Sequence, residues 1–259
     1  MRTGSGADII VDGDVVTKVH RAGTDPAALA IRLGIAVRLG GATGPLLAPL
    51  DTAPRAVDDR WSTRWPRVDT VPVRPDELPW VEAAHLLAHL HRAPVDVVIP
   101  HGAAARTLRA LQRLPAAASP VVSRASATLP DRARHAESAG RPRTLVHGDF
   151  HLGQLGRAPA GPWRLIDIDD LGAGDPAWDV ARPAGFWAAG LIPDEDWHAF
   201  LTAYRSAGGP AIPQSGDPWP ILEPLARAAV VQAAAAGAHR AVDETQAELL
   251  AACARMAVV

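Results

Sequence analysis

The chain has 259 residues, and its 48% hydrophobic and 21% charged residues are typical of a globular protein with a well-buried core. A formal net charge of -2 gives no basic field of the kind that nucleic-acid-binding proteins use. The single cysteine, Cys253, excludes an intramolecular disulfide and a cysteine-rich zinc site. No apolar run has the length of a membrane span or the form of a secretory signal, so we expect a cytoplasmic protein that contacts neither membrane nor nucleic acid.

The chain begins with predicted β-structure. Two β-branched runs, Ile9–Val11 and Val15–Val19, flank the turn signal Asp12-Gly13 and predict a hairpin. A helix is expected over residues 24–39, with a proline in its first turn. Two more short strands complete a small β-rich lobe, which we place at residues 1–65; these strands are expected at residues 46–50 and 59–65.

Residues 66–259 are predicted to form a second and mainly helical lobe, entered through a proline-rich connector at residues 66–79. Two short apolar strands, Thr144–Val146 and Trp163–Ile168, are expected near its centre. The other segments predict helices, over residues 81–94, 101–114, 121–139, 177–207 and 219–257. The order of elements therefore predicts an α+β fold with a reduced β-rich lobe followed by a helical lobe.

Asp149 is the leading catalytic candidate. It lies in His147-Gly-Asp-Phe-His-Leu-Gly-Gln154, directly after the first of the two strands, and therefore on a loop at a strand end. Three further carboxylates, Asp167, Asp169 and Asp170, end the second strand. Two such loops can face each other across one site, where one carboxylate serves a nucleophile and others serve magnesium, together with the amide oxygen of Gln154. That arrangement suits phosphoryl transfer, which needs positioning and charge neutralisation more than covalent help.

These residues carry a resemblance. The pattern His147-x-Asp149-x-x-x-x-Gln154, followed by Ile166-Asp167 and Gly174-Asp175-Pro176-x-x-Asp179, resembles the aminoglycoside phosphotransferase family, which also includes choline, homoserine and sugar kinases. The helix end Leu90-His91-x-x-Pro94 is similar as well. With glutamine at position 154, the motif is most similar to the maltokinase and glucosamine-kinase branch. The resemblance implies a two-lobed, protein-kinase-like fold that transfers the γ-phosphoryl group of ATP to a hydroxyl of a sugar, amino sugar or aminoglycoside.

The resemblance also implies roles for three residues of the helical lobe. Asp149 would act as the catalytic base that accepts the proton of the acceptor hydroxyl. Gln154 and Asp167 would hold Mg²⁺. By the same pattern, Asp175 and Asp179 are interpreted as residues that cap a helix and brace a loop.

In the N-terminal lobe, Lys18 would contact the α- and β-phosphates of ATP. It is the only lysine among 26 Lys and Arg residues, which favours a specific role for it over that of an ordinary surface lysine. Gly4, Ser5 and Gly6 would be the remainder of a glycine-rich phosphate loop, although a disordered start is the other interpretation. Kinase-like lobes usually pair this lysine with a glutamate on the next helix, but residues 27–39 contain no acidic residue.

Other hypotheses remain open from the sequence. The short glycine-rich start and the missing glutamate favour a pseudokinase that binds a nucleotide or another ligand without catalysis. His147, Asp149, His151 and Asp167 could instead form a hydrolytic transition-metal site. Asp167 could also be a nucleophile of the dehalogenase type, although such sites usually follow the first strand of a chain.

Tryptophans and acids of the helical lobe give a hint about the acceptor. Aromatic faces stack on sugar rings and attract cations, and acidic groups could receive an amino group. The other interpretation places the tryptophans in the core and the acids at solvated helix starts. The residues concerned are Trp178, Trp187, Trp197, Trp219, Asp194, Glu195, Asp196 and Glu223.

Overall fold

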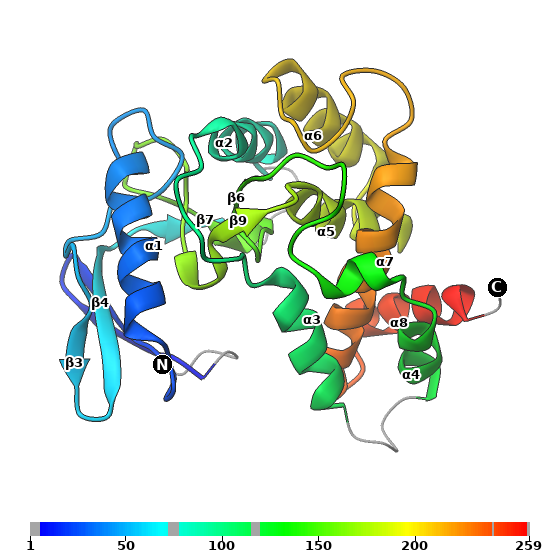
Figure 1. Cartoon of the computed structure of the whole chain (residues 1–259), viewed down its shortest axis with the longest axis horizontal. Helices are drawn as coiled ribbons and strands as arrows, with labels where there is room; N and C mark the ends of the chain where they lie inside the picture. Colours follow the sequence, from blue (N-terminus) through cyan, green and yellow to red (C-terminus); the bar gives the residue numbers. More distant parts are fainter. Residues whose placement is uncertain (1–5, 72–77, 115–119, 240, 258–259) are drawn as a thin grey trace.

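The computed structural model describes residues 6–71, 78–114, 120–239 and 241–257, and these form two lobes (Figure 1). The N-terminal lobe has a four-stranded antiparallel sheet with the strand order β1-β2-β4-β3, and one long helix. The fold is therefore of the two-lobed α+β class that the sequence predicts. The elements of this lobe are β1 (Asp8–Asp12), β2 (Val15–Val19), α1 (Pro26–Leu39), β3 (Arg55–Val57) and β4 (Arg60–Pro66).

The predicted hairpin is present, with its turn one residue later than expected. Asp12 pairs with Val15, so Gly13 and Asp14 form a two-residue loop, and Gly13 takes a positive φ of 56°. The prediction of a strand at residues 46–50 was wrong. Leu46 makes only an isolated bridge with Leu165 of the helical lobe, because prolines at positions 45 and 49 interrupt the run of backbone donors.

Seven helices are described in the second lobe, to the right of the N-terminal lobe in Figure 1. The helix expected over residues 121–139 is shorter, because Pro130 follows α4 and introduces a short 3-10 turn, η2 (Asp131–Arg134). No helix in the described part of the chain is long and apolar enough to cross a membrane. The helices are α2 (Trp80–Arg92), α3 (Ala103–Gln112), α4 (Pro120–Ala127), α5 (Ala177–Ala188), α6 (Asp194–Ser206), α7 (Trp219–Gly237) and α8 (Glu244–Met256).

Short strands at the centre of this lobe position the two candidate loops. β6 (Thr144–Val146) pairs with β9 (Gly172–Gly174). β7 (Leu155–Arg157) lies between β8 (Arg164–Leu165) and β5 (Asp69–Thr70). The loop that holds Asp149 joins β6 to β7, and the loop of carboxylates joins β8 to β9. Because both pairs are antiparallel neighbours, the two loops emerge beside each other.

The aromatic residues of the helical lobe pack on one another. Trp187 stacks on Trp197 with ring centroids 5.5 Å apart and meets Trp219 edge-on at 6.0 Å. Trp197 in turn stacks on the fully buried Phe200. These contacts support the interpretation that most of the tryptophans belong to the core.

Candidate active site

A buried carboxylate on α5 fixes the backbone of the loop that carries Asp149. The backbone N–H groups of His147 and Gly148 donate to the two oxygens of Asp179, at 2.7 and 2.8 Å. His91 Nε2 lies 3.0 Å from the same carboxylate, and its Nδ1 lies 2.7 Å from the hydroxyl of Tyr204. Burial alone would raise the pKa of Asp179, but the hydrogen bond and charge of His91 and the bonds from the loop outweigh it and lower that pKa. Asp179 therefore braces the loop, as its sequence position predicts.

Gly148 and His147 tie this loop to the loop of carboxylates. Gly148 has a φ of 82°, and a Cβ there would lie 2.4 Å from the carbonyl oxygen of Asp170, so only glycine fits. His147 Nε2 donates to the carbonyl oxygen of Ile166 at 2.8 Å, and its Nδ1 accepts from the N–H of Asp149. The imidazole of His147 is thus used in holding the two loops together.

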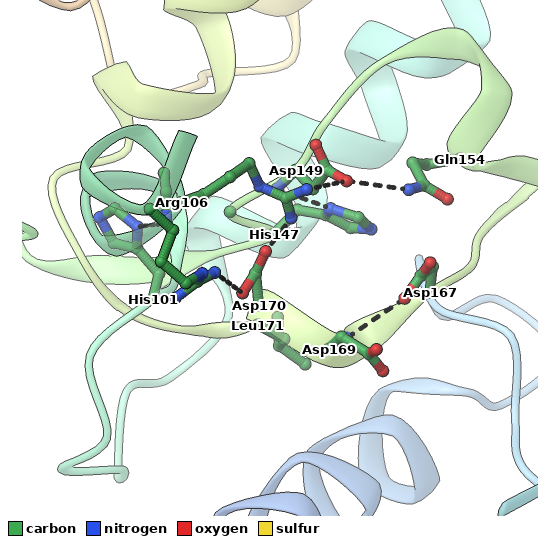
Figure 2. Close-up of polar contacts among 12 residues, drawn as sticks. His101, Arg106, His147, Asp149, Gln154, Asp167, Asp169, Asp170 and Leu171 are labelled. Carbon is green, nitrogen blue, oxygen red and sulfur yellow. Dashed lines mark hydrogen bonds and ion pairs between the residues drawn. The ribbon is translucent and has the colours of Figure 1, made fainter. Parts of the chain in front are cut away.

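The carboxylate of Asp149 lies between two arginines. Arg182 Nη1 on α5 approaches one oxygen at 2.7 Å, and Arg106 Nη1 on α3 approaches the other at 2.8 Å. Gln154 Nε2 donates to the second oxygen at 3.3 Å. Figure 2 shows that Arg106 also reaches Asp170 of the neighbouring loop. Neither arginine was predicted from the sequence, in which the only signal is the position of Arg182 one helical turn after Asp179.

Lys18 on β2 reaches across to the helical lobe. Its Nζ lies 2.7 Å from Asp167 Oδ1 and 2.8 Å from Asp169 Oδ2, and the side chain is 10% exposed. Burial would lower the pKa of Lys18, but the charges of Asp169 and Asp167 outweigh it and raise that pKa. The acidic partners that α1 lacks therefore come from the loop of carboxylates. Helix α1 contacts this loop instead through Arg32, whose Nε donates to the carbonyl oxygen of Leu171 at 2.9 Å.

Gln154 and Asp167, the residues expected to hold a metal, lie on adjacent loops. The backbone N–H of Ile166 donates to the carbonyl oxygen of Gln154 at 2.9 Å, which places Gln154 next to the strand that leads into Asp167. In Figure 2 the amide nitrogen of Gln154 lies toward Asp149. Carboxylate and amide oxygens are hard ligands of the kind that Mg²⁺ prefers, so the residues present fit this ion.

Asp167 takes a left-handed backbone conformation, with a φ of 60°. The predicted strand Trp163–Ile168 ends at Leu165 for this reason, and a short 3-10 turn, η4 (Ile168–Asp170), follows. The side chain of Asp167 accepts from the N–H of Asp169 and so caps this turn. A non-glycine residue held in this conformation is uncommon and is often found in functional loops.

The hypothesis of a hydrolytic transition-metal site is not supported. Within the described ranges, no group of three or more His, Cys, Asp or Glu side chains is close enough to hold a metal ion. His147 is bonded to Ile166, and His151 Nδ1 accepts from the N–H of Gly153 at 3.1 Å. Burial and the nearby charge of Arg182 lower the pKa of His151 to about 4.

Of the glycine-rich start, Gly4 and Ser5 lie outside the described residues. Gly6 precedes β1 with a φ of 86°. Its expected role at a phosphate therefore stays a prediction.

A cleft lies beside Asp149, lined by residues from α3, α5 and α7. Trp178 contributes to its wall, but the indole N–H donates to the carbonyl oxygen of His135, and the residue is 5% exposed. Two of the four acids expected to receive an amino group are engaged elsewhere: Asp194 accepts from Trp187, and Glu223 pairs with Arg227 in a different cleft between α5, α7 and α8.

The two lobes and the paired loops have the kinase-like fold of aminoglycoside phosphotransferase and choline kinase structures. A family model described as "Phosphotransferase enzyme family" matches residues 13–225, and the chain belongs to this family. A search of curated protein sequences found no significant match.

Solved structures with the same fold are similar over almost the whole chain. The aminoglycoside phosphotransferase APH(4)-Ia is 13% identical with a TM-score of 0.61, and the alignment covers 98% of this chain and 93% of that one. A thermostable mutant of the same enzyme, described as a ternary complex with AMP-PNP and hygromycin B, is 15% identical with a TM-score of 0.59, covering 97% and 93%. The choline kinase LicA from Streptococcus pneumoniae is 12% identical with a TM-score of 0.62, covering 97% and 89%.

Proposed function

We propose that this protein transfers the γ-phosphoryl group of ATP to a hydroxyl of a small polar molecule, with Asp149 as the catalytic base. The observation that carries the proposal is the arrangement of two loops. Gln154 contacts Asp149 of its own loop and pairs through its backbone with Ile166, the residue before Asp167 on the second loop. Lys18 reaches that second loop from the N-terminal lobe. Complexes of two APH(4)-Ia mutants, one with AMP-PNP and one with ADP, support ATP as the donor. From the sequence, a sugar, amino sugar or aminoglycoside is the favoured acceptor.

In this proposal, Asp149 orients the acceptor hydroxyl and takes its proton as the oxygen attacks the γ-phosphorus. Lys18 contacts the α- and β-phosphates once nucleotide separates it from Asp167 and Asp169. Gln154 and Asp167 are the residues that would hold Mg²⁺, which neutralises phosphate charge when bound. Asp169, once separated from Lys18, keeps its contact with His20. We place the boundary between the nucleotide lobe and the helical lobe between residues 65 and 66, at the end of β4.

A pseudokinase that binds a nucleotide without catalysis is the second candidate. The observation that favours it is that the key charges already neutralise one another, since Lys18 pairs with Asp167 and Asp149 pairs with two arginines. Such a protein would bind nucleotide and release no product.

Two measurements test the proposal. Thermal shift with Mg-ATP, Mg-GTP and ATP plus EDTA should show stabilisation by a nucleotide that depends on the metal. A phosphate-transfer screen over sugars, amino sugars, aminoglycosides, hydroxy acids and amino alcohols should then yield a phosphorylated product. Metal-dependent binding without transfer to any acceptor would favour the pseudokinase, and no binding of any nucleotide would contradict both candidates.

A further inference from the structure

The cleft beside Asp149 has more positive than negative side chains. Arg106 and Arg182 both line it, and Asp149 is the one acid among its lining residues. Arg106 also contacts Asp170, which has a further arginine, Arg109, 4.0 Å away. Three guanidinium groups therefore share two carboxylates, and the excess charge is positive.

The ionisation of the nearby basic groups reflects this excess. Burial lowers the pKa of Arg182, and Arg106 lowers it further against the opposing pull of Asp149. Burial and the neighbouring cations Arg21 and Arg106 lower the pKa of Arg109. Burial and the charge of Arg182 likewise lower the pKa of His151. Each of these groups has a cation beside it. Together these cations create a positive potential that a bound anion would neutralise.

The two arginines also have unused hydrogen-bonding capacity. The Nε–H groups of Arg106 and Arg182 are buried and have no partner among the described residues. Buried donors in native proteins are nearly always satisfied by protein, water or ligand. An oxyanion seated between the two guanidinium groups would provide acceptors, once the groups turn toward it. The guanidinium carbon of Arg182 also lies over the ring of Phe186, 5.4 Å from its centroid.

A bound anion would also change the contacts of Asp149. Arg182 occupies one carboxylate oxygen and Arg106 the other, and Gln154 shares the second. A catalytic base must accept a hydrogen bond from the acceptor hydroxyl. An anion that draws a guanidinium away from Asp149 would leave one of its oxygens free to do so.

We propose that the acceptor carries an anionic group, a carboxylate or a phosphate, which binds between Arg106 and Arg182 while its hydroxyl donates to Asp149. This inference rests on the proposed function. In the reaction, the hydroxyl proton passes to Asp149 and the hydroxyl oxygen forms a bond to the γ-phosphorus of ATP. The bond from that phosphorus to the β,γ-bridging oxygen breaks, and its electron pair leaves with ADP.

The proposal narrows the acceptor classes that the sequence favours. An amino sugar or an aminoglycoside would bring ammonium groups against Arg106 and Arg182, and the described residues that line this cleft include no second acid to receive them. A sugar acid, a sugar phosphate or a hydroxy acid matches the charge of the site.

The first experiment compares acceptors of matched shape and different charge. One series is glucose, glucosamine, glucuronate and glucose 6-phosphate, and a second is glycerol, 3-aminopropane-1,2-diol, glycerate and glycerol phosphate. Binding is measured by calorimetry on the whole protein with Mg-ADP present, and transfer is measured with Mg-ATP. We expect an anionic member to bind at least about tenfold more tightly than its neutral and cationic counterparts. Equal or weaker binding of all anionic members overturns the proposal. Within each series, comparing the carboxylate member with the phosphate member shows which anionic group is preferred.

The second experiment substitutes the arginines. Arg182→Gln and Arg106→Gln should raise the Kd and KM of the anionic acceptor by about 10- to 100-fold, with a much smaller change for the neutral counterpart. Arg255→Gln, an exposed arginine on the other cleft, is the control. An equal fall in kcat for acceptors of every charge would assign the arginines to the γ-phosphoryl group and overturn the proposal. Binding needs no turnover, so anion binding without any transfer would refute the proposed function and leave the charge selectivity of the cleft established.

Discussion

The two sides of the candidate site are held by different kinds of contact. On the side of the helical lobe, the Asp149 loop is fixed through its backbone, because His147 and Gly148 donate to the fully buried Asp179. On the side of the N-terminal lobe, Lys18 is held through ion pairs to Asp167 and Asp169, whose side chains are 37% and 35% exposed. The backbone hydrogen bonds to Asp179 involve no group that a ligand would bind. The ion pairs of Lys18, in contrast, join groups that a metal ion and phosphates would also bind.

The contacts of the Asp149 loop are therefore permanent, whereas those of Lys18 can be exchanged for contacts with a ligand. The backbone bonds to Asp179 give the loop one geometry whether or not a ligand is present. The ion pairs of Lys18 link the two lobes. When Mg-ATP binds, Lys18 would exchange the carboxylates for phosphates, and the carboxylates would exchange the ammonium group for Mg²⁺. The site is therefore assembled on the catalytic side and adjustable on the nucleotide side.

The largest expected effect is on turnover. Asp149→Asn retains the shape of the side chain but removes its basicity, so we expect phosphoryl transfer to fall by about 10²- to 10⁴-fold. Stabilisation by Mg-nucleotide, read by thermal shift, should remain, because Lys18 and Asp167 are unchanged. Asp96→Asn is the control, since Asp96 forms an exposed pair with Arg38. Full activity of Asp149→Asn on a confirmed acceptor would refute the proposed mechanism.

The second prediction concerns stability. Asp179→Ala leaves His91 and two backbone N–H groups without their buried acceptor, so the free energy of unfolding should fall by about 3–5 kcal/mol. Urea denaturation measures the loss. Asp131→Ala, at a side chain that is 86% exposed, should change the free energy of unfolding by less than about 0.5 kcal/mol. A similar small change for both variants would show that the loop is not held by Asp179.

The third prediction tests the exchangeable side. Lys18→Met removes the proposed contact to phosphate, so kcat/KM for ATP should fall by about 10- to 100-fold. In the same variant, Mg²⁺ alone should bind more tightly than in the wild type, because no ammonium group competes for Asp167 and Asp169. Calorimetry with Mg²⁺ in the absence of nucleotide measures this affinity. Weaker binding of Mg²⁺ by the variant would contradict the exchange of partners.

The same division explains what the sequence could predict. The Asp149 loop was found because its signals are local: a short strand, a glycine and carboxylates at fixed spacing, with Asp179 one helix later. Asp167, one partner of Lys18, lies 149 residues away from it, and Arg106 comes from a separate helix, so no periodicity or spacing links these residues to the loop. The sequence shows directly that α1 has no glutamate to pair with Lys18. That Asp167 and Asp169 pair with Lys18 instead could not be predicted, because this pairing depends on how the two lobes meet.

The strands show the same limit. β2 and β6 are β-branched or apolar runs beside clear turn signals, and both were predicted. β3, with the sequence Arg-Ala-Val and all three residues exposed, has no apolar alternation, and it exists because β4 provides a partner. Tertiary pairing rather than local propensity decides such a segment.

The smallest expected effect concerns pH and lies within the fixed loop. The folded-state pKa of His151 is about 4, below the ordinary value of 6.5, because burial and Arg182 disfavour the imidazolium. The unfolded chain therefore binds a proton that the folded chain does not, and this contribution to stability is present above pH 6.5 and is lost as the pH falls from 6.5 through 4. His151→Gln removes it, so the free energy of unfolding of the variant should fall less steeply than that of the wild type over this range. The buried His101, whose pKa is also lowered, retains a slope of the same sign in both proteins. Urea denaturation at pH 4.5, 5.5 and 7 measures the difference, and identical slopes would show that Arg182 and burial do not act on His151.

Because His151 is neutral at pH 7, the variant should also keep the ionisations of the kcat/KM profile between pH 6 and 8. A shifted ionisation there would give His151 a role in proton transfer that its surroundings oppose.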